Sequence, residues 1–194
     1  MISVIDYGAG NLRSVTNVLD AIGAAHRIAV HGDALDGATK LLLPGVGHFA
    51  QLATALDTLG LRAPLLAAVA SGVPVLGICL GMQILFESSD EAPGSKGLGV
   101  LTGHVSRLDG ADRLPHMGWN TVTPCVGSTL VPDADRFYFA NSYACPVTGA
   151  TAATVTYGTP FAAAVQAGPV SGVQFHPEKS GRAGVELVRR WAVA

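Results

Sequence analysis

Short apolar runs alternate with amphipathic segments through the first 88 residues of the chain. The apolar runs have the length of buried strands, and the segments between them repeat apolar side chains at helical spacing. The expected strands are residues 2–5, 27–30, 40–43 and 74–79, and the expected helices are residues 12–22, 49–59, a short segment before Ser71 and a segment that starts at Leu80. This alternation predicts a parallel, doubly wound sheet, in which ligands bind at the carboxyl ends of the strands.

The pattern changes after residue 97. Short strand-like runs separated by turn residues continue to about residue 173, and a last helix is expected over 183–193. The runs fall near residues 100 and 105 and at 121–123, 137–139, 154–157 and 162–165. We therefore expect a mostly parallel sheet with a small antiparallel extension. No repeat, low-complexity tract or linker divides the chain, which predicts a single domain over residues 1–194.

One uncharged stretch, residues 63–86, is long enough to cross a bilayer. Proline and glycine interrupt it at five positions, and residues 71–74 have the composition of a turn. We interpret the stretch as a helix, a strand and a second helix inside a globular core.

Charge and cysteine content narrow the function classes. The 12 basic and 14 acidic residues give a net charge of −2, which offers no broad basic surface to nucleic acid or anionic lipid. The three cysteines, Cys79, Cys125 and Cys145, follow neither a disulfide framework nor a CxxC zinc pattern, which favours a reducing compartment. Residues before Asp6 include no basic leader, so we expect a cytoplasmic protein.

Cys79 stands at the junction of an expected strand and an expected helix. Gly77 and Gly81 lie two residues before and two residues after it, the spacing of a strained elbow that projects a nucleophile. A helix that begins at Leu80 would point backbone N–H groups at the sulfur and favour the thiolate. The spacing alone leaves a second interpretation open, an inert cysteine of the core.

Two further segments supply chemistry that Cys79 lacks. Residues 44–48 end a strand with two glycines around Val46, so their backbone N–H groups could approach a ligand, although an ordinary turn has the same composition. His176 ends an apolar run, and the proline after it favours an extended backbone that brings His176 and Glu178 to one side. A histidine near a thiol can act as a base that a carboxylate orients, but a histidine at a strand end is also often structural.

Taken together, Pro44–Gly47, Gly77–Gly81 and Phe175–Glu178 resemble the motifs of class I (triad) glutamine amidotransferases, and the resemblance covers nearly the whole chain. Residues 6–12, 114–120 and 176–180 are similar to the branch of that family that serves histidine biosynthesis. The resemblance implies an α/β fold, the flavodoxin-like three-layer sandwich of these amidotransferases.

The resemblance also implies a role for each motif residue. Cys79 would attack the side-chain amide carbon of glutamine, His176 would transfer protons, and Glu178 would orient His176. The oxyanion hole would consist of the Leu80 N–H and an N–H of the Val46–Gly47 loop. Gly47, Gln83, Ser142 and Tyr143 would contact glutamine. This scheme requires no metal and no organic cofactor. Asn141 departs from the family, which more often has histidine there, and this weakens the transfer of pocket contacts through residues 140–143.

By resemblance, the ammonia passes to a (β/α)8-barrel cyclase subunit, the heterodimer partner, which uses it to form imidazole glycerol phosphate. Asn11, Trp119 and Lys179 match positions associated with that contact. Each also has a plain structural explanation, as a helix cap, a half-buried aromatic residue and a solvated lysine.

Three other functions remain open at this point. One is the glutaminase of another pathway, such as pyridoxal phosphate synthesis, against which residues 6–12 and 115–120 argue. Another is a Cys-His peptidase or esterase on a similar sheet, and the third is a non-catalytic binding subunit in which Cys79 is inert. A preference for glutamine, and protection of Cys79 by glutamine, would separate the last two from the expected enzyme.

Overall fold

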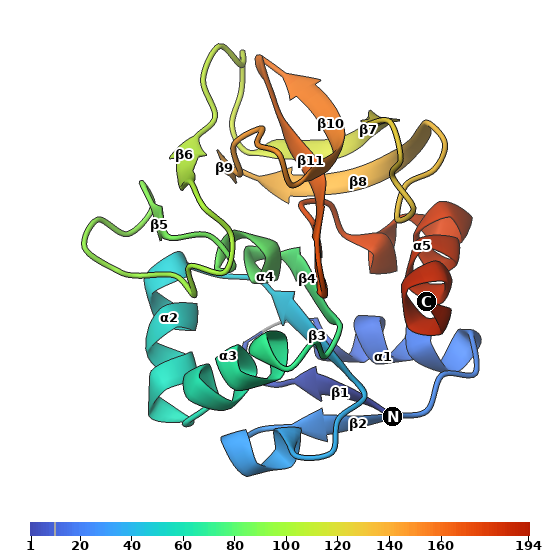
Figure 1. Ribbon diagram of the computed structural model, residues 1–194. Coiled ribbons are helices and arrows are strands. Elements are labelled where there is room, and N and C mark those ends of the chain that lie inside the picture. The colour runs from blue at the N-terminus through green and yellow to red at the C-terminus, as the bar shows by residue number, and fades with distance from the viewer. Residues whose placement is uncertain (10) are drawn as a thin grey trace.

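A nine-stranded sheet forms the centre of the molecule, with helices on both of its faces (Figure 1). The computed structural model describes residues 1–9 and 11–194; Gly10, part of the 6–12 stretch named above, lies outside the described residues. The elements of the first half are β1 (Ile2–Ile5), α1 (Leu12–Ala21), β2 (His26–Ala29), η1 (Gly32–Leu35), β3 (Lys40–Gly45), α2 (Phe49–Thr58), α3 (Arg62–Ala70), β4 (Val75–Cys79), α4 (Leu80–Gln83) and β5 (Ser88–Ser89). Those of the second half are β6 (His104–Arg107), β7 (His116–Pro124), β8 (Asp135–Asn141), β9 (Tyr143–Ala144), β10 (Thr151–Tyr157), β11 (Thr159–Ala167), β12 (Val170–Val173), η2 (Pro177–Lys179) and α5 (Gly181–Val193).

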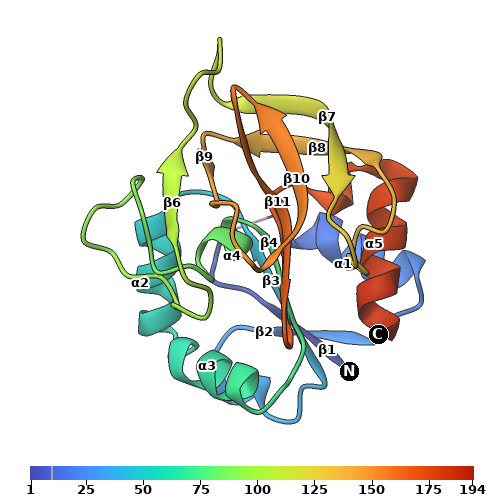
Figure 2. The ribbon, with the colours of Figure 1, turned by 45° about the horizontal axis from the view of Figure 1, so that its top comes forward.

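The strand order of the large sheet is β2-β1-β3-β4-β12-β11-β10-β7-β8. The first five strands are parallel, and the last four continue the sheet as antiparallel pairs. Figure 2 shows β7, β8, β10 and β11 rising above the parallel part. The sheet therefore has the predicted mostly parallel core with an antiparallel extension. A separate set of short strands, β5, β6 and β9, flanks it.

Each face of the parallel part is covered by helices whose apolar side chains point at it. On one face α1 and α5 pack with residues such as Leu19 and Leu187, and on the other α2 and α3 pack with Phe49 and Leu65. All four side chains are fully buried, and burial of one such side chain contributes about 1.5–3 kcal/mol to stability. The outcome is the predicted three-layer sandwich.

The helix after Cys79, α4, ends at Gln83 and is therefore shorter than the apolar pattern suggests. The carbonyl groups of residues 84–86 accept hydrogen bonds from the N–H groups of residues 98, 99 and 101 instead of continuing a helix. Tertiary contacts therefore decide where this helix stops. Near residue 100, where a strand-like run was expected, the chain bends without forming a strand.

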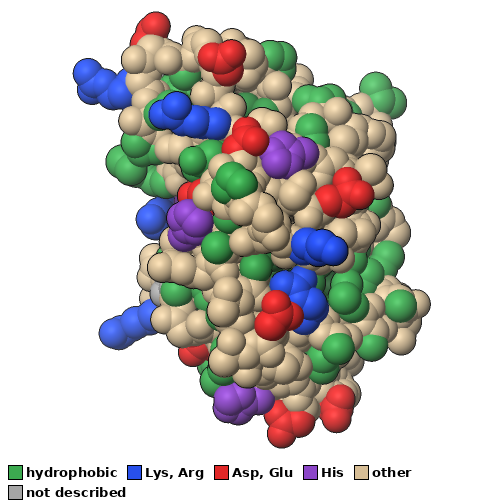
Figure 3. Space-filling view, turned by 90° about the vertical axis from the view of Figure 1, so that its left-hand side faces the viewer, with side chains coloured by type: hydrophobic (Ala, Val, Ile, Leu, Met, Phe, Trp, Pro, Cys, Tyr) green, Lys and Arg blue, Asp and Glu red, His purple; other side chains and the backbone are tan. Residues whose placement is uncertain are grey.

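Within the described residues, no single helix is long and apolar enough to cross a membrane; α2 and α3 reach that length only together, and their axes are bent by 90°. Figure 3 shows the molecule viewed from the left-hand side of Figure 1. Acidic and basic side chains are interspersed on this face. On that face, the described residues form no broad patch of either sign.

Three glycines let the backbones of β3, β4 and α4 pass within contact of one another. A Cβ atom at Gly81 would overlap the carbonyl oxygen of Leu43, one at Gly77 would overlap the carbonyl of Gly81, and one at Gly45 would overlap the Gly81 nitrogen. The three obstructing groups just named are backbone, so no side-chain rotation can relieve these overlaps. The turn at Cys79 therefore depends on the missing side chains.

Gly81→Ala should lower the free energy of unfolding by about 3 kcal/mol or more, since overpacking against backbone forces strands apart. The matched control is Gly149→Ala, where an added Cβ meets nothing within 4 Å. Urea denaturation of both variants measures the effect. Equal stability of the two variants would show that the elbow tolerates a methyl group.

Candidate active site

The carboxyl ends of three neighbouring parallel strands meet at one edge of the sheet. In the register of the strands, Gly45 of β3 lies beside Cys79 of β4, and Val173 of β12 lies beside Ile78. The loop after β3, the turn after β4 and the segment after β12 therefore converge. The three motif segments of the sequence are brought together in this way.

Cys79 occupies a strained backbone conformation at the end of β4. Its φ is 55° and its ψ is −111°, and it is the one non-glycine residue with positive φ among residues 1–9 and 11–194. Such a conformation costs about 1–3 kcal/mol and persists only where the surrounding structure enforces it. The close passage of Gly77 and Gly81 provides that enforcement. The turn keeps most of the residue buried, at 6% exposure, while its side chain lines a cavity.

His176 and Glu178 form a buried pair next to Cys79. The Nδ1 atom of His176 lies 2.8 Å from Oε1 of Glu178, and both side chains are at most 4% exposed. Burial alone lowers the pKa of His176, but hydrogen bonds to the Cys79 sulfur and to Glu178, together with their negative charges, raise it to about 10. These surroundings therefore favour the protonated imidazole, the form that a thiolate–imidazolium pair requires.

The turn that carries His176 is fixed by hydrogen bonds to strand β8. The His176 N–H donates to the Tyr138 carbonyl over 2.8 Å. The Ser180 hydroxyl donates to the His176 carbonyl over 2.6 Å and accepts from the Tyr138 N–H over 3.0 Å. Sequence reasoning gave Ser180 and Tyr138 no such role, since Tyr138 lies about 40 residues before both His176 and Ser180.

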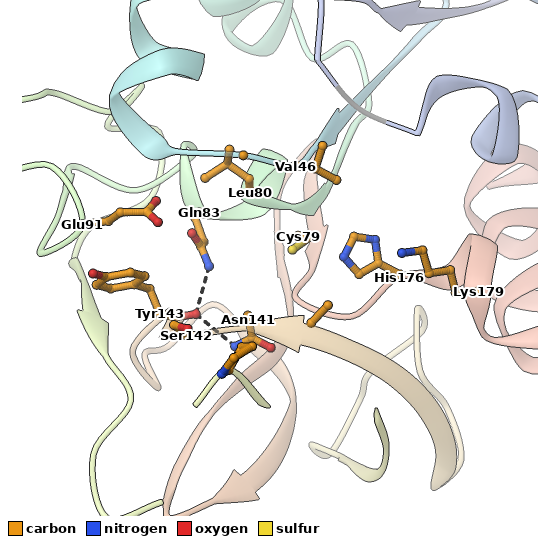
Figure 4. Close-up of a pocket in the computed structure, with 13 residues that line it drawn as sticks. Val46, Cys79, Leu80, Gln83, Glu91, Asn141, Ser142, Tyr143, His176 and Lys179 are labelled. Carbon is orange, nitrogen blue, oxygen red and sulfur yellow. Dashed lines mark hydrogen bonds between the residues drawn. The ribbon is translucent and has the colours of Figure 1, made fainter. Parts of the chain in front are cut away.

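A cavity of about 330 Å³ opens in front of the sulfur. Figure 4 shows Cys79 and His176 on one side of it and Gln83, Glu91 and Tyr143 on the other. The lining comprises Val46, Gly47, Cys79, Leu80, Gln83, Glu91, Pro115, Ala140, Asn141, Ser142, Tyr143, His176 and Lys179. Every residue expected to contact glutamine or an oxyanion lies in this wall, and Glu178 stands behind His176.

The hydroxyl of Tyr7 holds the loop after β3. It donates to the Val46 carbonyl and accepts from the Val46 N–H, both over 2.9 Å. Burial raises the pKa of Tyr7 to about 12, with smaller contributions from the charges of Cys79 and Asp6, so the donor is protonated at neutral pH. Because the Val46 N–H is engaged, the Gly47 N–H, at a residue with φ of 100°, is the loop donor left for an oxyanion. Tyr7 lies in the stretch of residues 6–12, but the sequence predicted no role for it.

Two glutamine side chains are in contact at the cavity: Gln83 lines it, and Gln174 lies behind Gln83 and Cys79. Gln83 Nε2 donates to the Tyr143 carbonyl over 2.9 Å and to Gln174 Oε1 over 3.1 Å, and Gln174 Nε2 lies 3.7 Å from the Cys79 sulfur. Gln174 was missed by sequence reasoning, although a polar residue inside the apolar run before His176 was a usable signal. Glu91 was also missed; it lines the cavity and accepts from the Phe49 N–H over 2.8 Å.

The three residues expected at a partner interface lie at the surface. Trp119 is 48% exposed and packs edge to face on Tyr138, with ring centroids 6.2 Å apart. The Lys179 ammonium lies 5.8 Å from the centre of the same Tyr138 ring. Asn11 precedes α1 but its side chain makes no capping hydrogen bond, so the helix-cap explanation does not hold for it. Trp119, Tyr138 and Lys179 thus form one surface beside the cavity.

The described residues include no group of three His, Cys, Asp or Glu side chains that could hold a metal ion. The chemistry that this arrangement can perform is nucleophilic attack by sulfur, with proton transfer by a carboxylate-oriented imidazole.

Comparison with known proteins agrees with this geometry. The family model "Glutamine amidotransferase class-I" matches residues 3–193. Relatives named imidazole glycerol phosphate synthase subunit HisH are 42% identical in Methanothermobacter thermautotrophicus (98% of this chain, 97% of that protein) and 46% identical in Cutibacterium acnes (98% and 95%). A HisH from Thermus thermophilus is 44% identical over 97% of this chain and 96% of its own length.

Solved structures show the same fold at lower identity. A glutamine amidotransferase crystal structure superposes with a TM-score of 0.79 at 19% identity, covering 100% of this chain and 99% of its own. The PurLQS structure from Thermotoga maritima contains a chain with a TM-score of 0.78 at 19% identity, covering 98% and 96%. The chain belongs to the class I glutamine amidotransferase family, and within it to the group of imidazole glycerol phosphate synthase HisH subunits.

Proposed function

We propose that this chain is the glutaminase subunit of imidazole glycerol phosphate synthase, a single-domain enzyme that releases ammonia from glutamine by means of Cys79, His176 and Glu178. One observation carries the proposal: a cysteine on a strained turn faces a cavity beside a buried histidine–carboxylate pair. The names of its relatives associate such chains with a synthase that makes imidazole glycerol phosphate. Its cysteines are all free, which suits a reducing cytoplasm.

The reaction proceeds in two acyl-transfer steps. The Cys79 thiolate attacks the side-chain amide carbon of glutamine, and protonated His176 gives its proton to the leaving nitrogen, so that ammonia departs and a thioester remains. Neutral His176 then takes a proton from water, which attacks the thioester and releases glutamate and the thiolate. Glu178 holds the ring orientation in both steps.

The oxyanion formed in each step needs hydrogen-bond donors. The Leu80 N–H, directly after the nucleophile, and the Gly47 N–H are the proposed donors, since Tyr7 already occupies the Val46 N–H. One such donor contributes about 3–4 kcal/mol to the stabilisation of the transition state.

The far wall of the cavity suits the amino-acid end of glutamine. Both side-chain hydrogen bonds that Gln83 makes with the described residues use its Nε2, so its Oε1 can accept from the α-ammonium group. The Glu91 carboxylate adds an opposite charge to the same wall, and Ser142 and Tyr143 contribute backbone polar groups. Together these groups favour a free amino acid over a peptide, whose corresponding nitrogen is an uncharged amide.

The synthase subunit that consumes the ammonia is proposed to be a (β/α)8-barrel cyclase, which docks on the surface formed by Trp119, Tyr138 and Lys179 with Asn11 nearby. An exposed tryptophan, a tyrosine and a lysine beside the opening of the cavity are residues suited to an interface next to an ammonia exit.

Cys79→Ala should lower glutamate release by about 10⁴-fold or more, because the variant lacks the sulfur that attacks the amide carbon. The release is measured with the cyclase subunit of the same organism and its nucleotide substrate present. Cys125→Ala, outside the cavity lining, is the matched control. Glutamate release that survives Cys79→Ala would contradict the assigned nucleophile.

Glu178→Gln should lower the pKa of His176 from about 10, because the variant loses the carboxylate that stabilises the imidazolium. In the unmodified protein the raised pKa stabilises the folded state fully below the unfolded pKa of about 6.5, and this stabilisation is lost as pH rises toward 10. Proton NMR of the His176 ring and unfolding free energies from pH 6 to 10 measure both effects. An unchanged His176 midpoint in Glu178→Gln would show that the pair is not coupled.

Trp119→Ala should weaken cyclase binding by about 2 kcal/mol, as expected for a central aromatic of an interface. The control is Val126→Ala, since Val126 is a fully exposed apolar residue on the loop after β7. Isothermal titration calorimetry of the two variants against the cyclase gives the comparison. Equal affinities would remove Trp119 from the interface.

A further inference from the structure

The side-chain amide of Gln174 is fully buried directly behind the nucleophile. Its Nε2 lies 3.7 Å from the Cys79 sulfur, while its Oε1 lies 3.1 Å from Gln83 Nε2 and 4.0 Å from the Cys145 sulfur. The residue follows β12, and its backbone N–H donates to the Ala163 carbonyl over 2.9 Å. Both ends of this amide are therefore engaged, and its backbone is anchored to the sheet.

The direction of these hydrogen bonds is fixed by a backbone group. The Tyr143 carbonyl can only accept, so the Gln83 atom that faces it, over 2.9 Å, must be the NH₂ group. That same NH₂ group also faces Gln174, so the facing atom of Gln174 must be its oxygen. The nitrogen of Gln174 then necessarily faces Cys79, and the sulfur is the acceptor.

Two neighbouring groups reinforce this direction. Asn141 Nδ2 also donates to the Tyr143 carbonyl, over 3.0 Å, which holds that acceptor in place. Complete burial raises the pKa of Cys145 well above its usual value, with a further contribution from the charge of Cys79, so its thiol is protonated and can donate to Gln174 Oε1. Every partner of the Gln174 oxygen is a donor.

We propose that Gln174 holds the Cys79 sulfur as a thiolate, by donating a side-chain N–H whose direction is imposed by the Tyr143 carbonyl through Gln83. A hydrogen bond from N–H to an anionic sulfur is stronger than one to a neutral thiol, and burial strengthens it further. Gln174 thereby supports the sulfur from behind while His176 supports it from the cavity side. The inference rests on the proposed function only in that Cys79 is the nucleophile.

Four titratable groups act on this sulfur, and one of them, Cys145, also contacts Gln174. His176 is cationic and hydrogen-bonded to Cys79, and Glu178 is bound to His176. Tyr7 and Cys145 interact electrostatically with Cys79 and are both neutral near pH 7. A substitution of Gln174 leaves the side chains of His176, Glu178 and Tyr7 in place and removes one acceptor from the Cys145 thiol.

The experiment is the pH dependence of Cys79 alkylation by iodoacetamide in the full-length chain, without glutamine, followed by mass spectrometry of the labelled peptide. Gln174→Met keeps the side-chain length but removes the donor, so the alkylation midpoint of Cys79 should rise by about one pH unit. At pH values below the midpoint, the fraction of Cys79 present as thiolate should then be about tenfold lower. Gln166→Met is the matched control, because Gln166 also makes three hydrogen bonds, but to Thr129 and Leu130 far from Cys79.

Gln174→Glu gives a sharper version of the test. Burial raises the pKa of the new carboxyl group; once ionised it can still accept from Gln83 but places a negative charge beside the sulfur, so the midpoint should again rise. A midpoint in Gln174→Met that equals that of the unmodified chain, in protein that still unfolds cooperatively, would overturn the proposal. Glutamate release surviving in Cys79→Ala would instead overturn the proposed function, so the two failures are distinguishable.

A measurement on the unmodified chain covers the case in which the Gln174 variants do not fold. The side-chain ¹H–¹⁵N resonances of Gln174 should shift with pH at the same midpoint as Cys79 alkylation, because the donor responds to the charge on its acceptor. The Gln166 resonances serve as the internal reference and should stay constant. Gln174 resonances that do not move through that midpoint would also overturn the proposal.

Discussion

The close approach of three glycine backbones at the end of β4 is the constraint on which the site depends. With no side chains at Gly45, Gly77 and Gly81, strands β3 and β4 and the short helix α4 occupy space that any Cβ would fill. This packing forces Cys79 into its positive φ and turns its side chain toward the cavity. The register of β3, β4 and β12 then brings the other two segments to the same edge, so the positions of the loop donor and the histidine follow from the sheet itself.

Much of the fold and the site could be predicted because their signals are local in the sequence. The parallel strands end at the residues that carry the chemistry, and the Phe175–Glu178 segment places an imidazole and a carboxylate two residues apart, so their pairing needs no long-range information. The length of the helix after Cys79 was not predictable in this way. Its carbonyl groups find partners at residues 98–101, which no pattern within residues 80–86 reveals.

The contacts that refine the site depend on residues far apart in the chain. Tyr7 reaches Val46 across 39 positions, and Gln174 reaches Cys79 across 95. Each of these polar side chains sits within or beside an apolar run, where the sequence shows that it is buried but not what it meets. Asn141 is a similar case: its amide nitrogen holds the Tyr143 carbonyl, a task that a histidine donor could also perform.

Strand β8 contributes to two surfaces of the molecule at once. Tyr138 presents its ring to Trp119 and Lys179 outside and its backbone to the His176 turn inside, and residues 140–141 of the same strand line the cavity. At about 3.3 Å per residue, Tyr138 and the cavity-lining Asn141 are only about 10 Å apart along one strand. Because the Tyr138 backbone also holds the turn that carries His176, a displacement of the Tyr138 ring would move the His176 imidazole as well.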